Sequence, residues 1–177
     1  MFWPIIATPK TVLRRVERRD EIDLRAIFWD FEIEQPIGSV DQYPGIDEKE
    51  EVNNLTVQGG GPVATAMVTL SRLGASTAFI GKISDDSFGD LIKEGLISER
   101  VNIDYIVIEK GKRSQFAFIV IEKETGKRTV LWSSATVTPL VAEEINRDVI
   151  DSAKVLLLDG LMKDISIVAA EYARDAG

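Results

Sequence analysis

Three consecutive glycines, Gly59 to Gly61, stand directly before a helical pattern and constrain this chain more than any other feature. Because glycine has no Cβ, this backbone can adopt positive φ angles and approach a ligand closely. Pro62 suits the first turn of a helix, where its missing N–H costs no hydrogen bond. The unpaired N–H groups and the positive dipole end of such a helix attract hydroxyl or phosphate oxygens. We therefore expect this loop to contact a small molecule.

The composition is that of a globular domain without thiol or imidazole chemistry. The chain has 177 residues, 45% of them hydrophobic and 28% charged, which is enough for one domain with its own core. Its net charge of -8 argues against nucleic-acid binding, and no segment reads as a membrane span or signal peptide. The absence of cysteine and histidine excludes disulfides, thiol catalysis, the usual zinc sites and Ser-His nucleophiles. We expect a cytoplasmic protein.

The order of helical and strand patterns predicts an α/β fold. Gly74 suits the end of the helix that follows the glycines, and Asp85 and Asp86 offer N-caps, which explains them better than a metal pair does. An apolar run followed by an amphipathic helix, at residues 155–177, is typical of a parallel βα unit. Helical patterns cover residues 11–25, 63–73, 91–99 and the segment after 160, and strand patterns cover 26–33, 50–57, 77–80, 105–108, 116–122, 128–133 and 155–158.

The segment from Gly59 to Ala64 also satisfies the dinucleotide-binding pattern G-x-G-x-x-(G/A). Its context fits that function poorly. Residues 51–58 are polar where the first Rossmann strand should be apolar, and the strand after the helix ends in Gly81 rather than in an acid placed for the ribose. A purely structural tight turn is a further alternative for the same residues.

Residues 58–177 resemble the PfkB (ribokinase-like) family of carbohydrate and nucleoside kinases. The resemblance is carried by GGGPVATAMVTLSRLGA at 59–75, TAFIGKISDDSFGDLI at 77–92, VNIDYIVI at 101–108, QFAFIVIEKETGKRTVLW at 115–132 and VLLLDG at 155–160. Asp41 to Gly45 (DQYPG) is similar to the D-x-Y-P segment that follows the family's first strand. The resemblance implies a central, mostly parallel sheet flanked by helices, with a small β lid over a sugar.

The same resemblance implies a set of substrate-binding residues. Gly60 and Gly61 would line the sugar site through their backbone, and Thr65 stands where many members have an asparagine that bonds sugar hydroxyls. Asp159 matches a position that some members use on the sugar, although capping of the next helix explains it equally well. The family's sugar-gripping aspartate falls on Gln35, which can bond a hydroxyl but supplies no charge.

Three lid residues are further candidates by resemblance. Phe116 and Phe118 would cover an apolar face of the sugar, or would pack within the hairpin. Arg128 would reach a carboxylate or phosphate substituent, with a solvated strand position as the alternative.

The resemblance is partial at both ends. Residues 1–35 form an atypical N-terminal segment, and residues 36–177 a partial kinase domain with lid strands at about 104–133, incomplete at its C-terminus. No G-A-G-D-like segment, which in the family carries the phosphate-binding loop and the catalytic aspartate, occurs in the chain. We therefore predict no catalytic, cofactor-binding or metal-binding residue here, and no turnover by this chain alone.

The functional hypothesis is the N-terminal part of a kinase that transfers a phosphoryl group from ATP, with Mg²⁺, to a sugar or sugar acid. The alternative is a non-catalytic half-domain that binds a sugar or a partner, and a dinucleotide-binding enzyme is a weaker third reading. Neither nucleic acid nor membrane is an expected partner, and two copies are expected to pair through their lids.

Overall fold

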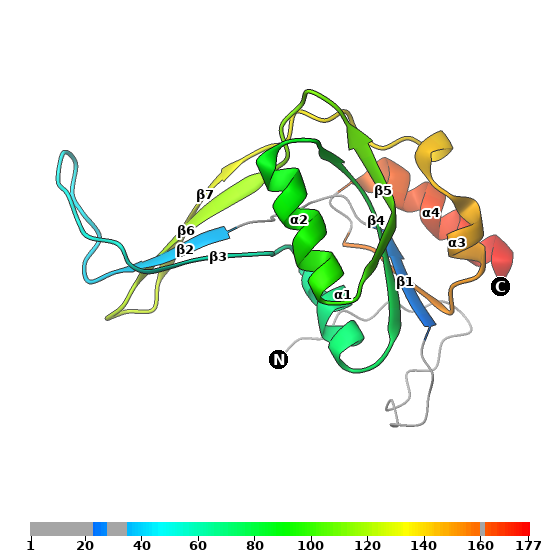
Figure 1. Ribbon diagram of the computed structural model, residues 1–177, viewed down its shortest axis with the longest axis horizontal. Coiled ribbons are helices and arrows are strands. Elements are labelled where there is room, and N and C mark those ends of the chain that lie inside the picture. Colours follow the sequence, from blue (N-terminus) through cyan, green and yellow to red (C-terminus); the bar gives the residue numbers. More distant parts are fainter. Residues whose placement is uncertain (1–22, 28–34, 160–161) are drawn as a thin grey trace.

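The computed structural model describes residues 23–27, 35–159 and 162–177, with residues 23–27 and 35–36 described through their backbone. Its strands form two four-stranded sheets, shown in Figure 1. The main sheet is wholly parallel and has the order β5 (Asn102–Glu109), β4 (Ser76–Ser84), β1 (Asp23–Ile27) and β8 (Val155–Leu157). The lid sheet is mixed and has the order β3 (Asn53–Gln58), β2 (Gln35–Val40), β6 (Phe116–Glu122) and β7 (Arg128–Ser133).

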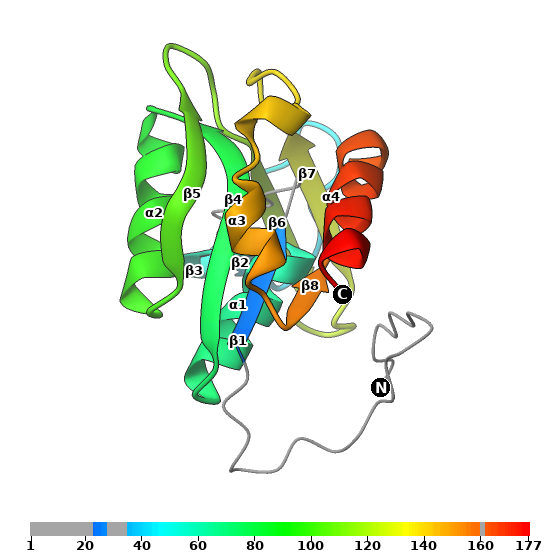
Figure 2. The same cartoon turned by 90° about the vertical axis from the view of Figure 1, so that its right-hand side faces the viewer.

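Helices cover both faces of the main sheet, as Figure 2 shows. Helices α1 (Pro62–Arg72) and α2 (Ser87–Ser98) pack on one face, where Phe79 and Ile83 of β4 are buried. The 3-10 helix η1 (Ala142–Glu144), α3 (Arg147–Asp151) and α4 (Lys163–Ala176) pack on the other, over Ala78 and Ile80. Side chains alternate along a strand, so β4 supplies both hydrophobic clusters. The expected α/β class with a parallel sheet and a β lid is confirmed.

The ends of the first two helices follow from local sequence. Pro62 is the first residue of α1, and Gly74 ends that helix with a φ of 93°. The N–H of Gly74 bonds Ser71 O and that of Ala75 bonds Leu70 O, which is a Schellman motif. Asp86 caps α2 by accepting a hydrogen bond from the Gly89 N–H at 2.9 Å. These local signals were read correctly from the sequence.

The strand positions were predicted less well. The segment expected to be helical at 11–25 contributes residues 23–25 to β1, and the remainder of it lies outside the described residues. The first strand was expected at 26–33, of which residues 28–33 lie outside the described residues. The described strand β1, Asp23–Ile27, lies between β4 and β8, so the atypical N-terminal segment supplies a central strand of the main sheet.

The lid also differs from the range of 104–133 that we expected. Strand β5 belongs to the main sheet, where it pairs with β4, and two of the lid strands, β2 and β3, come from residues 35–58. In Figure 1 the lid sheet extends away from the α/β body, with the loop after β2 at its far end.

Two glycines of α2 provide a matched test of the packing. A Cβ on Gly89 would lie 2.0 Å from Ser84 O, whereas a Cβ on Gly95 meets no atom within 4 Å. We expect Gly89→Ala to lower the free energy of unfolding by about 1–3 kcal/mol, because the backbone around it must shift. Gly95→Ala should raise the same quantity by about 0.5–1 kcal/mol through its helix propensity. Urea unfolding measures both, and equal stability of the two variants would contradict this packing.

Candidate functional site

The strand order of the main sheet points to one edge as the place for a ligand. From β1 the chain proceeds through β4 to β5 on one side and later returns to β8 on the other side of β1. In open parallel sheets, ligands bind at the carboxyl ends of the strands where the order reverses in this way. That point lies between β1 and β8. Asp159 follows two residues after the end of β8 and is half-buried.

The glycine loop reaches the same level of the sheet. Helix α1 has 11 residues and a length of about 16 Å, which equals the rise of about five strand residues. Since α1 ends just before the start of β4, its first turn lies near the level of Ile80, where β1 ends in register. The loop and Asp159 therefore lie at the same edge, at the ends of neighbouring elements.

The start of α1 leaves backbone donors unused. Gly61 is the N-cap residue with φ 88° and ψ 144°, and no side chain caps this helix. The first intrahelical bond runs from Thr65 N to Gly61 O at 3.1 Å, so the N–H groups of Val63 and Ala64 have no partner within the helix. Helices α2 and α3, in contrast, are capped by the side chains of Asp86 and Asn146. The glycine loop is therefore suited to bind oxygen atoms of a ligand.

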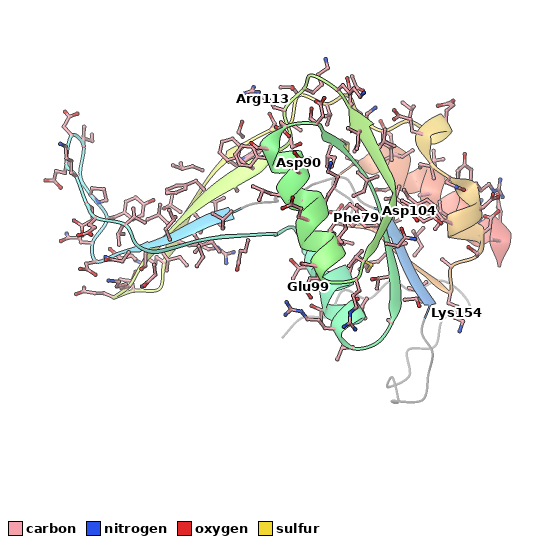
Figure 3. The ribbon with its side chains drawn as sticks, viewed as in Figure 1. Phe79, Asp90, Glu99, Asp104, Arg113 and Lys154 are labelled. Carbon is pink, nitrogen blue, oxygen red and sulfur yellow. The ribbon has the colours of Figure 1, made fainter. Side chains whose placement is uncertain are left out.

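An open pocket of about 250 Å³ lies between α1 and α2 and extends to the glycine loop. It brings together Gly60, which is buried, and Thr65, which is exposed. Arg72 and Glu99 form a side-chain ion pair at its other end, and Glu99 is visible at the lower end of α2 in Figure 3. The hydrogen bond from Arg72 lowers the pKa of Glu99. The other lining residues are Gln58, Gly59, Ala64, Val68, Leu91, Ile92, Gly95, Leu96 and Ser98.

Gln35 stands beside the glycine loop through its backbone. It begins β2 and pairs in register with Gln58, the last residue of β3 before the glycines. The loop is thus the connection between the lid and the first helix of the body. This arrangement differs from a dinucleotide-binding turn, in which the strand before the glycines belongs to the parallel sheet, because β3 belongs to the lid.

The lid candidates do not gather at one point. Phe116 and Phe118 lie on one face of β6, and the ring of Phe116 stacks on Phe88 of α2 with centroids 4.8 Å apart. Arg128 is exposed at the far end of the hairpin, opposite Ile121, about 17 Å along the strand from the level of Phe116. The structure therefore does not bring Arg128 to the glycine loop.

Ala117 and Ile119 were not identified from the sequence as buried residues of the lid. They occupy the face of β6 opposite to Phe116 and Phe118 and are only 0% and 8% exposed. The run from Phe116 to Ile121 is apolar at every position, so no alternation indicated which face would be covered.

Neither a metal cluster nor a spanning helix was found in the part of the chain that the structure describes. No group of three or more acidic side chains there is arranged to hold a metal ion. None of the helices described is both long enough and apolar enough to cross a membrane.

Comparisons with known proteins agree on one family. The model of the pfkB family of carbohydrate kinases matches residues 33–176. The fructokinase of Solanum tuberosum is 30% identical over 151 residues, which cover 81% of this chain and 47% of that protein. Fructokinase-2 of Solanum habrochaites is also 30% identical over 151 residues, covering 81% of this chain and 46% of that enzyme. The chain thus spans about half the length of the curated relatives it matches.

Solved structures show the same fold. The ribokinase of Arabidopsis thaliana complexed with ribose and ATP superposes with a TM-score of 0.73 at 18% identity, covering 88% of this chain and 51% of that one. The fructokinase of Xylella fastidiosa with bound ATP gives a TM-score of 0.66 at 18% identity, covering 88% of this chain and 50% of that one. With a family model matched over most of its length, the chain belongs to the pfkB family of carbohydrate kinases.

Proposed function

We propose that this chain is the sugar-binding N-terminal part of an ATP-dependent carbohydrate kinase that phosphorylates a sugar or sugar-acid hydroxyl. The observation that carries the proposal is the placement of the glycine loop, whose helix has no side-chain cap, and of Asp159 at the same edge of the main sheet, where the strand order reverses. Backbone N–H groups and a carboxylate are complementary to hydroxyl groups, which both donate and accept hydrogen bonds.

In the proposed site, the backbone N–H groups and the carboxylate have different roles. The N–H groups of Val63 and Ala64 would donate to sugar oxygens, while the carboxylate of Asp159 would accept from sugar hydroxyls. Gly60 and Gly61 would let the backbone approach the sugar, and Thr65 and Gln35 flank this loop on either side. Phe116 and Arg128 are left out of the proposed contacts, since the first stacks on α2 and the second lies at the lid tip.

ATP and Mg²⁺ belong to the complete enzyme in this proposal. Phosphoryl transfer needs a phosphate cradle, a metal and a group that orients the nucleophile. The described residues do not fit these needs, since they hold no acidic cluster for a metal and the chain has no G-A-G-D-like segment. The alternative, a half-domain that binds a sugar without catalysing a reaction, is supported by the same lack of a G-A-G-D-like segment in the chain.

We further propose that two copies pair through their lids. The support is a set of exposed apolar side chains on the two edge strands of the lid, β3 and β7, since edge strands can pair with another chain. These residues are Leu55, Val57, Val130, Leu131 and Trp132, of which Trp132 is 63% exposed.

Ligand-dependent melting tests the proposed function. We expect fructose or ribose to raise the melting temperature of the chain, because a ligand at 100 times its Kd stabilises a folded protein by about 2.7 kcal/mol. NAD should have no effect. Stabilisation by NAD alone would favour the dinucleotide reading, and the absence of any effect from a panel of sugars and sugar acids would contradict sugar binding.

Asp159 and Asp164 provide a matched pair of variants near this edge. Asp159→Asn should weaken sugar binding by about ten- to a hundredfold, since a hydrogen bond to a charged group contributes about 1.5–3 kcal/mol. Asp164→Asn, at an exposed position in the first turn of α4, should bind like the unmodified chain. Titration calorimetry measures both, and equal affinities would remove Asp159 from the site.

Alanine variants of Gly61 and Gly59 distinguish the effect of backbone strain from the effect of an added methyl group. Gly61→Ala places a side chain at φ 88°, at a cost of about 1–3 kcal/mol. Gly59→Ala adds a Cβ with no atom within 4 Å. We expect Gly61→Ala alone to lower both the melting temperature and the sugar affinity. If Gly59→Ala reduced stability as strongly as Gly61→Ala, the assigned loop conformation would be wrong.

A further inference from the structure

Three segments of the chain meet at the carboxylate of Asp86. Its Oδ1 accepts a hydrogen bond from the Gly89 N–H of α2 at 2.9 Å and a second from Ser114 Oγ at 2.6 Å. Its Oδ2 accepts from the Ser114 N–H at 2.9 Å. Ser114 stands two residues before β6, so one side chain joins the start of α2 to the base of a lid strand.

The polar groups around this contact are buried and bonded to one another. Ser114 is 3% exposed, and its Oγ accepts from the Ser84 N–H at 3.0 Å, at the end of β4. Ser84 is 0% exposed, and its hydroxyl donates to Glu109 O at 2.9 Å and accepts from the Lys112 N–H at 3.0 Å. Because both serines are buried and every polar group named here is bonded, a rearrangement of this network would leave a buried polar group unpaired.

The neighbouring lid strand is attached at the same place. The N–H of Arg113 donates to Thr136 Oγ1 at 2.8 Å, and the N–H of Thr136 donates to Arg113 O at 2.9 Å. These bonds tie the chain leaving β7 to the chain entering β6. Figure 3 shows Arg113 where the lid joins the body, close to the upper end of α2. The two other lid strands have a different attachment, since β3 leads into the glycine loop.

Asp86 is charged in this setting. Burial raises the pKa of its carboxyl group, but the hydrogen bonds from Ser114 and Gly89 outweigh burial, so the pKa lies below its ordinary value. Both oxygens therefore act as acceptors at neutral pH, as the three donors facing them require.

We propose that Asp86 is a positioning residue for sugar binding, which holds the β6 end of the lid at a fixed place relative to the glycine loop. This role rests on the proposed sugar-binding function, and it goes beyond the helix capping for which Asp86 was singled out in the sequence. The lid is then anchored at Asp86 on its β6 side, while its β3 strand continues directly into the glycine loop.

Asp86→Asn separates charge from shape. An asparagine has the same outline and is an equally good N-cap, but its amide nitrogen is a donor. In either orientation of the amide, this nitrogen faces an N–H group, that of Ser114 or that of Gly89. Ser114→Ala provides a second variant, which removes the hydroxyl bond to Oδ1 and the acceptor of the Ser84 N–H, and leaves the cap bond from Gly89 in place. Asp90→Asn is the control, since Asp90 is an exposed residue of α2, labelled in Figure 3.

Hydrogen exchange of the lid amides at 117–121 reports how firmly the lid is anchored, and exchange of the α2 amides at 91–97 reports the capping of α2. Calorimetric titration with fructose measures sugar binding by the same variants. We expect Asp86→Asn and Ser114→Ala each to reduce protection in the lid by about tenfold more than in α2, and to weaken fructose binding by about tenfold. Asp90→Asn should change neither quantity.

Two results would overturn the positioning role. One is an equal loss of protection over the lid, α2 and the rest of the body, which would mean general destabilisation. The other is unchanged lid protection in both variants. If the unmodified chain bound no sugar while both variants still loosened the lid selectively, the sugar-binding function would fail and Asp86 would remain as the lid anchor.

Discussion

Burial of β4 on both of its faces is the constraint on which the rest of this structure depends. Phe79 packs under α1 and α2, while Ile80 packs under α3 and α4. The one cation of the strand, Lys82, has a side chain only 6% exposed and is held by Glu144 at 2.6 Å. Its bonds to Thr138 and Glu144 offset the cost of burying its charge. With its central strand covered on both sides, the sheet fixes where its carboxyl ends lie.

The candidate site follows from that placement. The ends of β1 and β8, the start of α1 and Asp159 are at one edge because a parallel sheet collects the ends of all its strands there. The lid reaches this edge through two unlike attachments. One is a network of partly buried hydrogen bonds around Asp86 and Ser114, and the other is a glycine loop without side-chain caps. The first attachment depends on side-chain hydrogen bonds, whereas the second depends on glycine backbone.

What could be predicted from the sequence was local. The start of α1 at Pro62, its end at Gly74 and the cap at Asp86 depend on residues within one helical turn. Which strand a segment pairs with depends on residues far away in the sequence. For this reason we assigned β5 to the lid, although it pairs with β4 in the main sheet. The contact of Asp86 with Ser114 spans 28 residues and gives no periodic signal, although the cap itself was expected. Arg128 has the right chemistry to bind a carboxylate or phosphate, but its distance from the site depends on the register of the β6–β7 hairpin.

The position of β1 in the main sheet has a consequence for biosynthesis. Residues 23–27 leave the ribosome first among the described strands, yet they lie between β4 and β8, whose residues are made much later. Pairing of strands that are far apart in the sequence is slow. Until their partners have been made, unpaired strands of a parallel sheet are prone to aggregate. The lid strands β2 and β3 pair with each other long before the main sheet can close on β8. A nascent chain of this kind would have a complete β2–β3 hairpin while the main sheet still lacks β8.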